Sequence, residues 1–259
     1  MPLNWMKDIR EKSIESLLLL EECQLEWIPQ DYLRRQWALV LRAYPHIGWF
    51  IAHKCPDKAE WVDALNAEAA ALPAVDEAGL RAACGDILQA FEDWIIYALE
   101  PQIYAGRPHN GWDERELTGL CDFAGLRVVD IGSGTGKQMF ALAGVARTVY
   151  GVEPVSSLRT YLRREAERRG YANVHVVDGL MCALPFEDGF ADAVVSGHVY
   201  GDQPEAELRV LKSGGLLALV PGNADSDNAC HEYLLAQGFR WSRFEEPGDG
   251  MKRKYWKTK

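Results

Sequence analysis

The feature that most restricts the fold of this chain is a regular alternation of strand-like and helix-like segments, which begins at residue 127. The strand-like segments are short and apolar, whereas the intervening segments repeat their apolar residues with a helical period. Strands that alternate with helices build a parallel sheet covered by helices on both faces. The predicted strands occupy residues 127–131, 148–152, 174–177, 191–196 and 215–220, and the predicted helices occupy residues 137–144, 156–169, 205–211 and 228–237.

Two further strands are predicted near the C-terminal end, over residues 239–244 and 252–256. The segment between them reads Pro-Gly-Asp-Gly at residues 247–250, a composition typical of turns. A hairpin of this kind adds antiparallel strands to the edge of a parallel sheet. Residues 111–259 are therefore expected to form an α/β domain with a seven-stranded, mostly parallel sheet and an antiparallel C-terminal hairpin.

The N-terminal region, residues 1–110, has the pattern of a separate all-helical unit. Apolar residues recur at helical spacing opposite acidic ones, and prolines interrupt the pattern. Prolines and glycines predict a loop over residues 101–111, and Asp113 with Glu116 resembles a capping box that starts a short helix. The predicted helices cover residues 13–27, 29–41, 55–71, 76–99 and 113–123, with Pro45 marking the end of the second.

The distribution of charge narrows the classes of function. Residues 1–125 hold 11 Lys and Arg against 21 Asp and Glu, whereas residues 126–259 hold 17 of each, so the net charge of −10 belongs to the first half. An acidic surface repels a phosphate backbone. Nucleic acid is therefore not expected as a partner.

The chain also lacks the patterns of membrane and secreted proteins. No apolar run reaches about 18 residues, and the N-terminus has no basic segment followed by an apolar one. The six cysteines are scattered without a Cys-x-x-Cys pair, which is typical of reduced proteins. We therefore expect a cytoplasmic protein with no membrane partner, present as a monomer or a homodimer.

A glycine-rich loop follows the first predicted strand, where residues 128–136 read VVDIGSGTG. Ligands of parallel sheets bind at the carboxyl ends of the strands, where this loop lies. Its spacing is Gly-x-Gly-x-Gly, whereas a dinucleotide loop requires Gly-x-Gly-x-x-Gly, and Lys137 follows at the wrong spacing for a P-loop. Asp130 stands beside the loop, and a carboxylate there opposes a bound phosphate but suits a bound ammonium group.

Two more acidic residues follow neighbouring strands. Glu153 ends the second strand, where an acid accepts hydrogen bonds from ribose hydroxyls, and Asp178 follows the third strand, where an acid accepts from an adenine amine. A nucleoside with an amino-acid tail and no phosphate satisfies all three carboxylates. We therefore expect S-adenosyl-L-methionine as the cofactor and S-adenosyl-L-homocysteine as its product. The candidate cofactor-binding residues are Asp130, Gly132, Ser133, Gly134, Gly136, Glu153, Pro154, Asp178, Gly179, Leu180 and Ser196.

Four segments resemble, in order, the motifs of class I S-adenosylmethionine-dependent methyltransferases, of the broad type that includes the ubiquinone and menaquinone biosynthesis enzymes. They are VVDIGSGTG at 128–136, VYGVEPV at 149–155, VVDGLMCALPFEDGFADAVVS at 176–196 and ELRVLKSGGLLALVPG at 207–222. Ser213 stands where the family usually has proline, which changes only a turn residue. The resemblance covers roughly residues 126–259 and implies a Rossmann-like catalytic domain that binds S-adenosylmethionine.

The resemblance does not extend to residues 1–110. In this fold the catalytic core is often generic and added elements choose the methyl acceptor, so we expect the helical region to form a cap over the acceptor pocket. Seven of the nine tryptophans lie within the first 112 residues, and aromatic walls suit a small planar or apolar acceptor. Tyr97, Tyr104 and Trp112 are the candidates for acceptor contacts, because they lie just before the first strand.

The segment after the fourth predicted strand holds the candidates for catalysis, His198 and Tyr200, with Asp202 as a weaker one. Methyl transfer is an in-line displacement, and a base is needed only when the acceptor carries a proton that it does not lose freely. His198 is the first candidate for this base and for an acceptor contact, because histidine titrates near neutrality. The alternative is that His198 only caps or packs against the next helix.

No metal site is expected, because His46, His53 and Cys55 have no recognised zinc spacing. Taken together, the motifs predict a methyltransferase that acts on a small-molecule methyl acceptor. The alternatives are an RNA or protein methyltransferase and a non-catalytic S-adenosylmethionine-binding protein.

Overall fold

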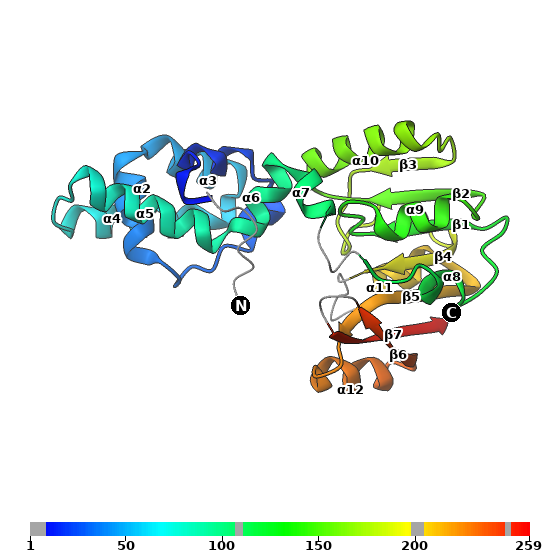
Figure 1. The fold of residues 1–259 in the computed structure, drawn as a ribbon. Helices are drawn as coiled ribbons and strands as arrows, with labels where there is room; N and C mark the ends of the chain where they lie inside the picture. The colour runs from blue at the N-terminus through cyan, green and yellow to red at the C-terminus, as the bar shows by residue number, and fades with distance from the viewer. Residues whose placement is uncertain (1–8, 107–110, 198–204, 247–249) are drawn as a thin grey trace. The chain divides into compact units, whose positions relative to one another are not determined.

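The computed structural model describes residues 9–106, 111–197, 205–246 and 250–259 (Figure 1). The chain divides into two compact units, Met1–Ile103 and Tyr104–Lys259, slightly before the boundary at residue 110 that the sequence indicates. No helix within these described ranges is both long enough and apolar enough to cross a membrane.

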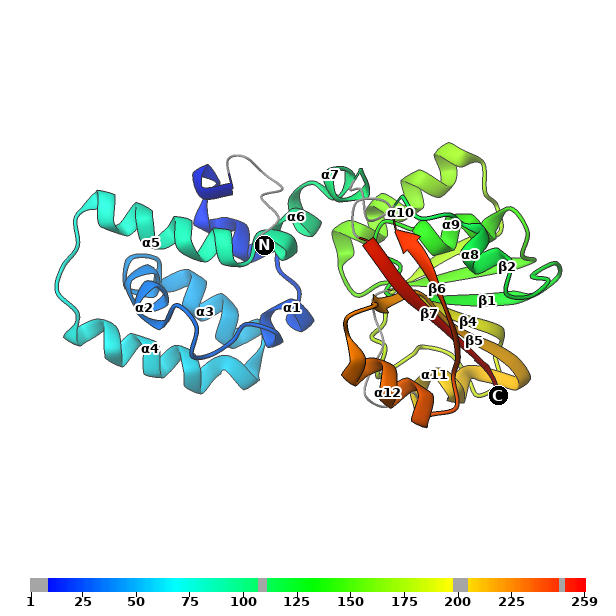
Figure 2. The ribbon, with the colours of Figure 1, turned by 60° about the horizontal axis from the view of Figure 1, so that its bottom comes forward.

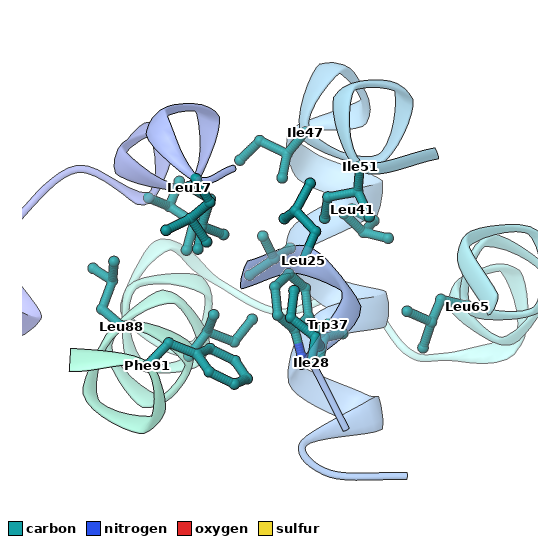
Figure 3. Packing of buried hydrophobic residues seen from close by; sticks show 14 of the residues in the cluster. Leu17, Leu25, Ile28, Trp37, Leu41, Ile47, Ile51, Leu65, Leu88 and Phe91 are labelled. Carbon is teal, nitrogen blue, oxygen red and sulfur yellow. The ribbon is translucent and has the colours of Figure 1, made fainter. Parts of the chain in front are cut away.

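The first unit is built from helices (Figure 2). Its central helix is α2 (Arg34–Ala43), whose Trp37 is completely buried and meets Trp61 edge-on, with ring centroids 5.4 Å apart. Figure 3 shows Trp37 among aliphatic side chains such as Leu25 from other helices. The unit therefore has a hydrophobic core of its own. Its remaining described helices are η1 (Ile9–Glu11), η2 (Ile14–Leu19), α1 (Glu22–Glu26), α3 (Pro45–Lys54), η3 (Pro56–Lys58), α4 (Ala59–Ala71), α5 (Glu77–Ala90) and α6 (Glu92–Leu99).

Several helix boundaries in this unit differ from the sequence prediction; α2, for example, begins at Arg34 rather than at residue 29. The predicted helix over residues 13–27 is interrupted at Leu20, whose extended backbone separates η2 from α1. Pro45 marks the end of the second predicted helix, since α2 ends at Ala43, and it also begins α3, because the fixed φ angle of proline suits the first position of a helix. The predicted helix over residues 76–99 breaks at Phe91, which lies between α5 and α6.

Two short helices precede the first strand. α7 (Pro101–Ala105) occupies a segment predicted to be a loop, again with proline at its first position. α8 (Arg115–Thr118) starts two residues later than predicted and without the predicted capping box, although a carboxylate oxygen of Asp113 accepts a hydrogen bond from the Arg115 amide at 2.9 Å. It ends at Gly119, earlier than the predicted end at residue 123.

The second unit contains a seven-stranded sheet in the order β3-β2-β1-β4-β5-β7-β6. The strands β1 to β5 pair in parallel, and β7 is antiparallel to both β5 and β6, which confirms the predicted sheet and its C-terminal hairpin. The chain order reverses between β1 and β4, and ligands of such sheets bind at this switch point. The strands are β1 (Arg127–Ile131), β2 (Thr148–Val152), β3 (Val174–Val177), β4 (Ala191–Ser196), β5 (Leu211–Ala224), β6 (Arg240–Glu246) and β7 (Gly250–Thr258).

Helices cover both faces of this sheet (Figure 1). On one face, Met139 of α9 (Lys137–Ala143) and Leu162 of α10 (Ser156–Arg169) share a hydrophobic cluster with Val128 of β1. On the other face, Leu234 of α12 (Asn228–Ala236) shares a cluster with Leu217 of β5, and α11 (Glu205–Val210) contributes its last residue. The two clusters hold the sheet between helical layers.

One row of paired residues marks the carboxyl edge of the sheet. Four of the five parallel strands, β1 to β4, end at this row, so the segments that follow them leave the sheet at one edge. β5 continues past the row, which makes it longer than the predicted strand over residues 215–220. From β3 to β6 the row consists of Val177, Val152, Ile131, Ser196, Leu219, Tyr255 and Trp241.

Candidate functional site

The glycine loop, residues 132–136, turns sharply between β1 and α9. Gly132, Gly134 and Gly136 have positive φ angles of 66°, 53° and 90°, a region that residues with side chains rarely adopt. Gly136 is also tightly enclosed, because a Cβ atom there would lie 2.4 Å from Cε2 of Phe140. The loop therefore requires glycine both for its backbone conformation and for its packing.

Glu153 holds the loop from the neighbouring strand. It directly follows β2, is 4% exposed, and accepts hydrogen bonds from the amides of Gly134 at 2.8 Å and Val155 at 2.9 Å. Burial raises the pKa of its carboxyl to about 7, although the two amides partly offset this effect. A carboxylate has about four lone pairs, so Glu153 can still accept hydrogen bonds from a ligand.

Asp130 lies completely buried at the end of β1. Neither of its carboxylate oxygens has a hydrogen-bond partner among the described residues, and the nearby Ser133 hydroxyl donates instead to the Asp130 backbone carbonyl at 3.1 Å. Burial raises the pKa of the Asp130 carboxyl to about 7; the nearby Ser133 hydroxyl and Met139 amide oppose this shift, and the charge of Glu153 adds to it. A nearby cation would stabilise the ionised carboxylate, whereas an anion would be repelled.

Arg159 of α10 joins the ends of β2 and β3. Its Nη1 donates to the backbone carbonyls of Glu153 at 2.9 Å and Pro154 at 2.6 Å. The same nitrogen pairs with Oδ1 of Asp178 at 3.0 Å, while the Asp178 side chain remains 71% exposed and accessible to a ligand. The sequence does not indicate a role for Arg159 beyond its place in the first turn of α10, because two of its partners are backbone carbonyls.

Gly179 and Leu180 continue from Asp178 along the same edge. Gly179 packs closely, since a Cβ atom there would lie 2.8 Å from Cδ of Pro185. Leu180 is 37% exposed and forms an isolated antiparallel bridge with Ala183. The exposed Leu180 side chain can contact the face of an aromatic ring, and the exposed Asp178 carboxylate can accept from its polar edge. This placement is compatible with the adenine contacts that the sequence predicts.

Ser196 and Gln138 connect β4 to its neighbours at the switch point. The buried Ser196 hydroxyl donates to the Ile131 carbonyl at 3.3 Å. Gln138, which the sequence analysis did not select, is buried and donates to the Val220 carbonyl at 2.9 Å. Its Nε2 would lie 2.3 Å from a Cβ atom at Gly197, so a side chain at this position would displace the Gln138 amide.

The residues predicted to contact the acceptor lie in different surroundings. Trp112 is 2% exposed within the core of the second unit, and the Lys137 ammonium lies 5.2 Å from the centroid of its ring. Tyr104 is half-buried in α7, and Tyr97 packs, half-buried, against the core of the first unit. These placements identify Trp112 chiefly as a core residue, and the acceptor contacts of all three stay predictions.

The predicted catalytic residues, His198 and Tyr200, lie outside the described residues, as does Asp202. Their roles therefore stay predictions. Within the part of the chain that the structure describes, no group of three or more His, Cys, Asp or Glu side chains is arranged to hold a metal ion.

The arrangement fits a cationic nucleoside that carries no phosphate. A tight glycine loop, a buried acid at the end of β1 and an acid with free lone pairs at the end of β2 meet at the edge where the chain order reverses. Two basic side chains near the loop are paired with acids, Lys137 with Glu114 at 3.4 Å and Arg159 with Asp178 at 3.0 Å. Among the described residues, negative rather than positive charge therefore dominates beside the loop, as S-adenosylmethionine requires and a pyrophosphate does not.

Comparisons of the sequence with known proteins agree with this chemistry. A family model described as a methyltransferase domain matches residues 129–219. A protein-L-isoaspartate O-methyltransferase of Nitrosomonas europaea is 34% identical over 52% of this chain and 61% of its own length. An arsenite methyltransferase of Aquipseudomonas alcaligenes is 30% identical over 47% and 42%, and a demethylmenaquinone methyltransferase of Lactococcus lactis is 26% identical over 46% and 50%.

The matches span only part of these relatives, between 42% and 61% of their lengths. Among solved structures, a SAM-dependent methyltransferase from Aquifex aeolicus overlaps 62% of this chain and 90% of its own, with a TM-score of 0.46 and 19% identity. Residues 129–219 thus match a methyltransferase domain, and the strand order and the glycine loop with its acids fit a class I core that takes S-adenosylmethionine as its cofactor.

Proposed function

We propose that this protein transfers the methyl group of S-adenosylmethionine to a small-molecule acceptor. The observation that carries the proposal is the pair of buried carboxyls at the glycine loop, Asp130 and Glu153, both with raised pKa values. Such a pair favours a ligand that brings positive charge and hydroxyl donors. The acidic N-terminal half supports a small acceptor rather than a nucleic acid.

Different residues of the site would bind the cofactor, contact the acceptor and accept its proton. When bound, the cofactor supplies an electrophilic methyl group, and the protein mainly aligns the acceptor with it. Glu153 would accept hydrogen bonds from the ribose hydroxyls of the cofactor, and Asp178 would accept one from its adenine amine. Asp130 would favour the ammonium group of the cofactor. The predicted acceptor contacts are Tyr97, Tyr104, Trp112 and His198, and the predicted proton acceptors are His198 and Tyr200.

A second candidate is methylation of a protein carboxyl group. The observation that favours it is the printed name of several relatives, protein-L-isoaspartate O-methyltransferase, including one that is 25% identical over 75% of this chain. An acceptor of this kind is a peptide, so it differs from a small molecule in size and in the chemistry of the accepting group.

Release of S-adenosylhomocysteine from the full-length protein separates the two candidates. We expect release with a dialysed small-molecule extract, and none with an isoaspartyl peptide or with bulk tRNA. Release with the peptide alone would support the second candidate instead. Glu153→Ala should lower release at subsaturating cofactor by weakening cofactor binding at least about tenfold, since hydrogen bonds to a charged acceptor are lost, whereas Glu167→Gln, at an exposed residue of α10, should not.

A further inference from the structure

A histidine of α12 is held by a chain of buried polar groups that the cofactor site does not use. Nδ1 of His231 lies 3.0 Å from the hydroxyl of Tyr255, and that hydroxyl donates to Oδ1 of Asn223 at 2.7 Å. Tyr255 is completely buried and Asn223 is 4% exposed, whereas His231 is only partly buried. Nδ1 of the imidazole is therefore held inside the protein, whereas His231 as a whole remains partly exposed.

The direction of these hydrogen bonds assigns the proton of the imidazole. Nδ2 of Asn223 donates to the Asp227 carbonyl at 3.1 Å, which fixes the amide so that its Oδ1 faces Tyr255. The single hydroxyl proton of Tyr255 is then used toward Asn223, so its oxygen must accept from Nδ1 of His231. Burial raises the pKa of Tyr255 to about 12, which keeps this hydroxyl protonated. Nε2 of His231 consequently carries the lone pair.

This network lies at the carboxyl edge of the sheet, beside the cofactor site. Tyr255 occupies the same row as Ser196, with Leu219 of β5 between them. Adjacent strands are about 4.8 Å apart, so the backbone of Tyr255 lies about 10 Å from that of Ser196. His231 is in the first turn of α12, the helix that follows β5 at this edge. The imidazole is thus placed on the side of the switch point away from the glycine loop.

The surroundings of the network restrain the imidazole without adding an unpaired charge. The ring of Trp241 meets His231 edge-on, with centroids 4.5 Å apart. The guanidinium groups of Arg243 and Arg253 both bind Oδ1 of Asp225, at 2.8 Å each. The titratable and charged groups around the network are Tyr255 and Arg253 of β7, Arg243 of β6, Asp225 and Asp227 after β5, and Cys230 of α12.

We propose that His231 takes the proton of a hydroxyl group on the methyl acceptor, with Tyr255 and Asn223 as the residues that position it. Nε2 of His231 is the basic nitrogen. Its Nδ1 is held by the Tyr255 hydroxyl, and that hydroxyl is held by Asn223. This is the geometry of an oriented general base. The inference rests on the proposed function, because it names the acceptor as a hydroxyl compound.

The proton and electron balance of the step is complete. The lone pair of the acceptor oxygen forms the new bond to the methyl carbon while the bond between that carbon and the sulfonium sulfur breaks, and its electrons stay on the sulfur. The acceptor proton moves to Nε2 of His231, which becomes an imidazolium and later releases the proton to water. No oxidant or metal ion takes part.

The tautomer of His231 is the most direct readout, because it needs no acceptor. Long-range nitrogen–proton NMR correlations on the full-length protein with labelled histidine distinguish protonated Nδ1 from protonated Nε2. We expect the proton on Nδ1 in the wild type, and on Nε2 in Tyr255→Phe, which removes only the hydroxyl. A wild-type His231 with its proton on Nε2 overturns the proposal, whatever the activity.

Turnover gives the second readout. With the small-molecule extract and simple phenols as acceptors, His231→Gln should lower kcat/KM at least about 100-fold and remove the acid limb of the pH–rate profile. Binding of S-adenosylmethionine should be unchanged, and His175→Gln, at an exposed histidine of β3, should match the wild type.

Two outcomes separate this inference from the proposed function. If His231→Gln keeps the wild-type rate and pH profile, His231 is not the proton acceptor, although methyl transfer stands. If the wild-type protein releases no S-adenosylhomocysteine with any acceptor, the proposed function fails and this inference fails with it.

Discussion

At the scale of single residues, the site depends on two carboxyl groups that the folded chain holds in an unfavourable place. Asp130 has no hydrogen-bond partner in the described part of the chain, and Glu153 has only two backbone amides. Burying a carboxylate without a paired cation destabilises a protein and raises the pKa of the group. The arrangement is explained by a ligand that supplies the missing positive charge and the missing donors.

The stability of the protein should therefore depend on pH through Asp130. Its pKa in the folded state is about 7, whereas an unperturbed aspartate has a value of about 3.9. Because the folded state holds the proton more tightly, the stability present below about pH 4 is lost as the pH rises toward about 7. Asp130→Asn removes this loss. The Tm of the variant minus the Tm of the wild type should therefore be about 5 °C larger at pH 8 than at pH 4.5. Thermal unfolding across this range measures it.

Asp192→Asn is the matched control, because its pKa is displaced in the opposite direction. Burial alone raises the pKa of Asp192, but hydrogen bonds from Lys212 and from the Arg127 amide outweigh burial and lower it overall. The stability that Asp192 contributes is present above its unfolded pKa and lost as the pH falls. That contribution is complete above about pH 5, so the Tm difference between Asp192→Asn and the wild type should stay constant between pH 4.5 and pH 8. Parallel trends for the two variants would contradict the assigned origin of the Asp130 effect.

The sequence was informative for residues whose role follows from their position at a strand end. Glu153 and Asp178 were selected because acids after the second and third strands meet at one edge. Arg159 and Gln138 escaped notice because they bind backbone carbonyls, and a carbonyl is present at every position of a chain. His231 escaped notice because its partners lie on two other strands.

At the scale of elements, the strands of the sheet were easier to predict than the helices of the first unit. The strands β1 to β4 have the predicted bounds, because each is a short apolar run between a turn and a glycine or acid. In the first unit, Leu20 and Phe91 interrupt helices although neither is a helix breaker. Both residues are buried, so tertiary packing rather than local preference sets these breaks.

The glycine loop is the element whose shape the site requires most strictly. Gly136→Ala places a Cβ atom 2.4 Å from Phe140 at a φ angle of 90°. Strain and overpacking should add to a loss of roughly 3 kcal/mol in the free energy of unfolding, together with weaker cofactor binding. Gly170→Ala is the control, because Gly170 has a φ angle of 74° with nothing within 4 Å of the added Cβ. It should lose only about 1 kcal/mol and bind the cofactor normally; equal losses for both variants would show that backbone strain alone matters.

At the scale of the whole molecule, the chain combines a unit that contains the methyltransferase-domain match with a helical unit that this match does not reach. The methyltransferase model ends at residue 219 and starts at residue 129, well inside the second unit. The division into two units follows from the change of hydrophobic period near residue 111, which the sequence shows. The acceptor does not follow in the same way, because it depends on side chains brought together from distant segments.

The central claim is that the edge between β1 and β4 binds S-adenosylmethionine rather than a dinucleotide. Isothermal titration of the full-length protein with S-adenosylmethionine, and separately with NAD, tests it most directly. The account predicts saturable one-to-one binding of S-adenosylmethionine, weakened at least about tenfold by Glu153→Ala, and no comparable binding of NAD. Tight binding of NAD together with no binding of S-adenosylmethionine would contradict it.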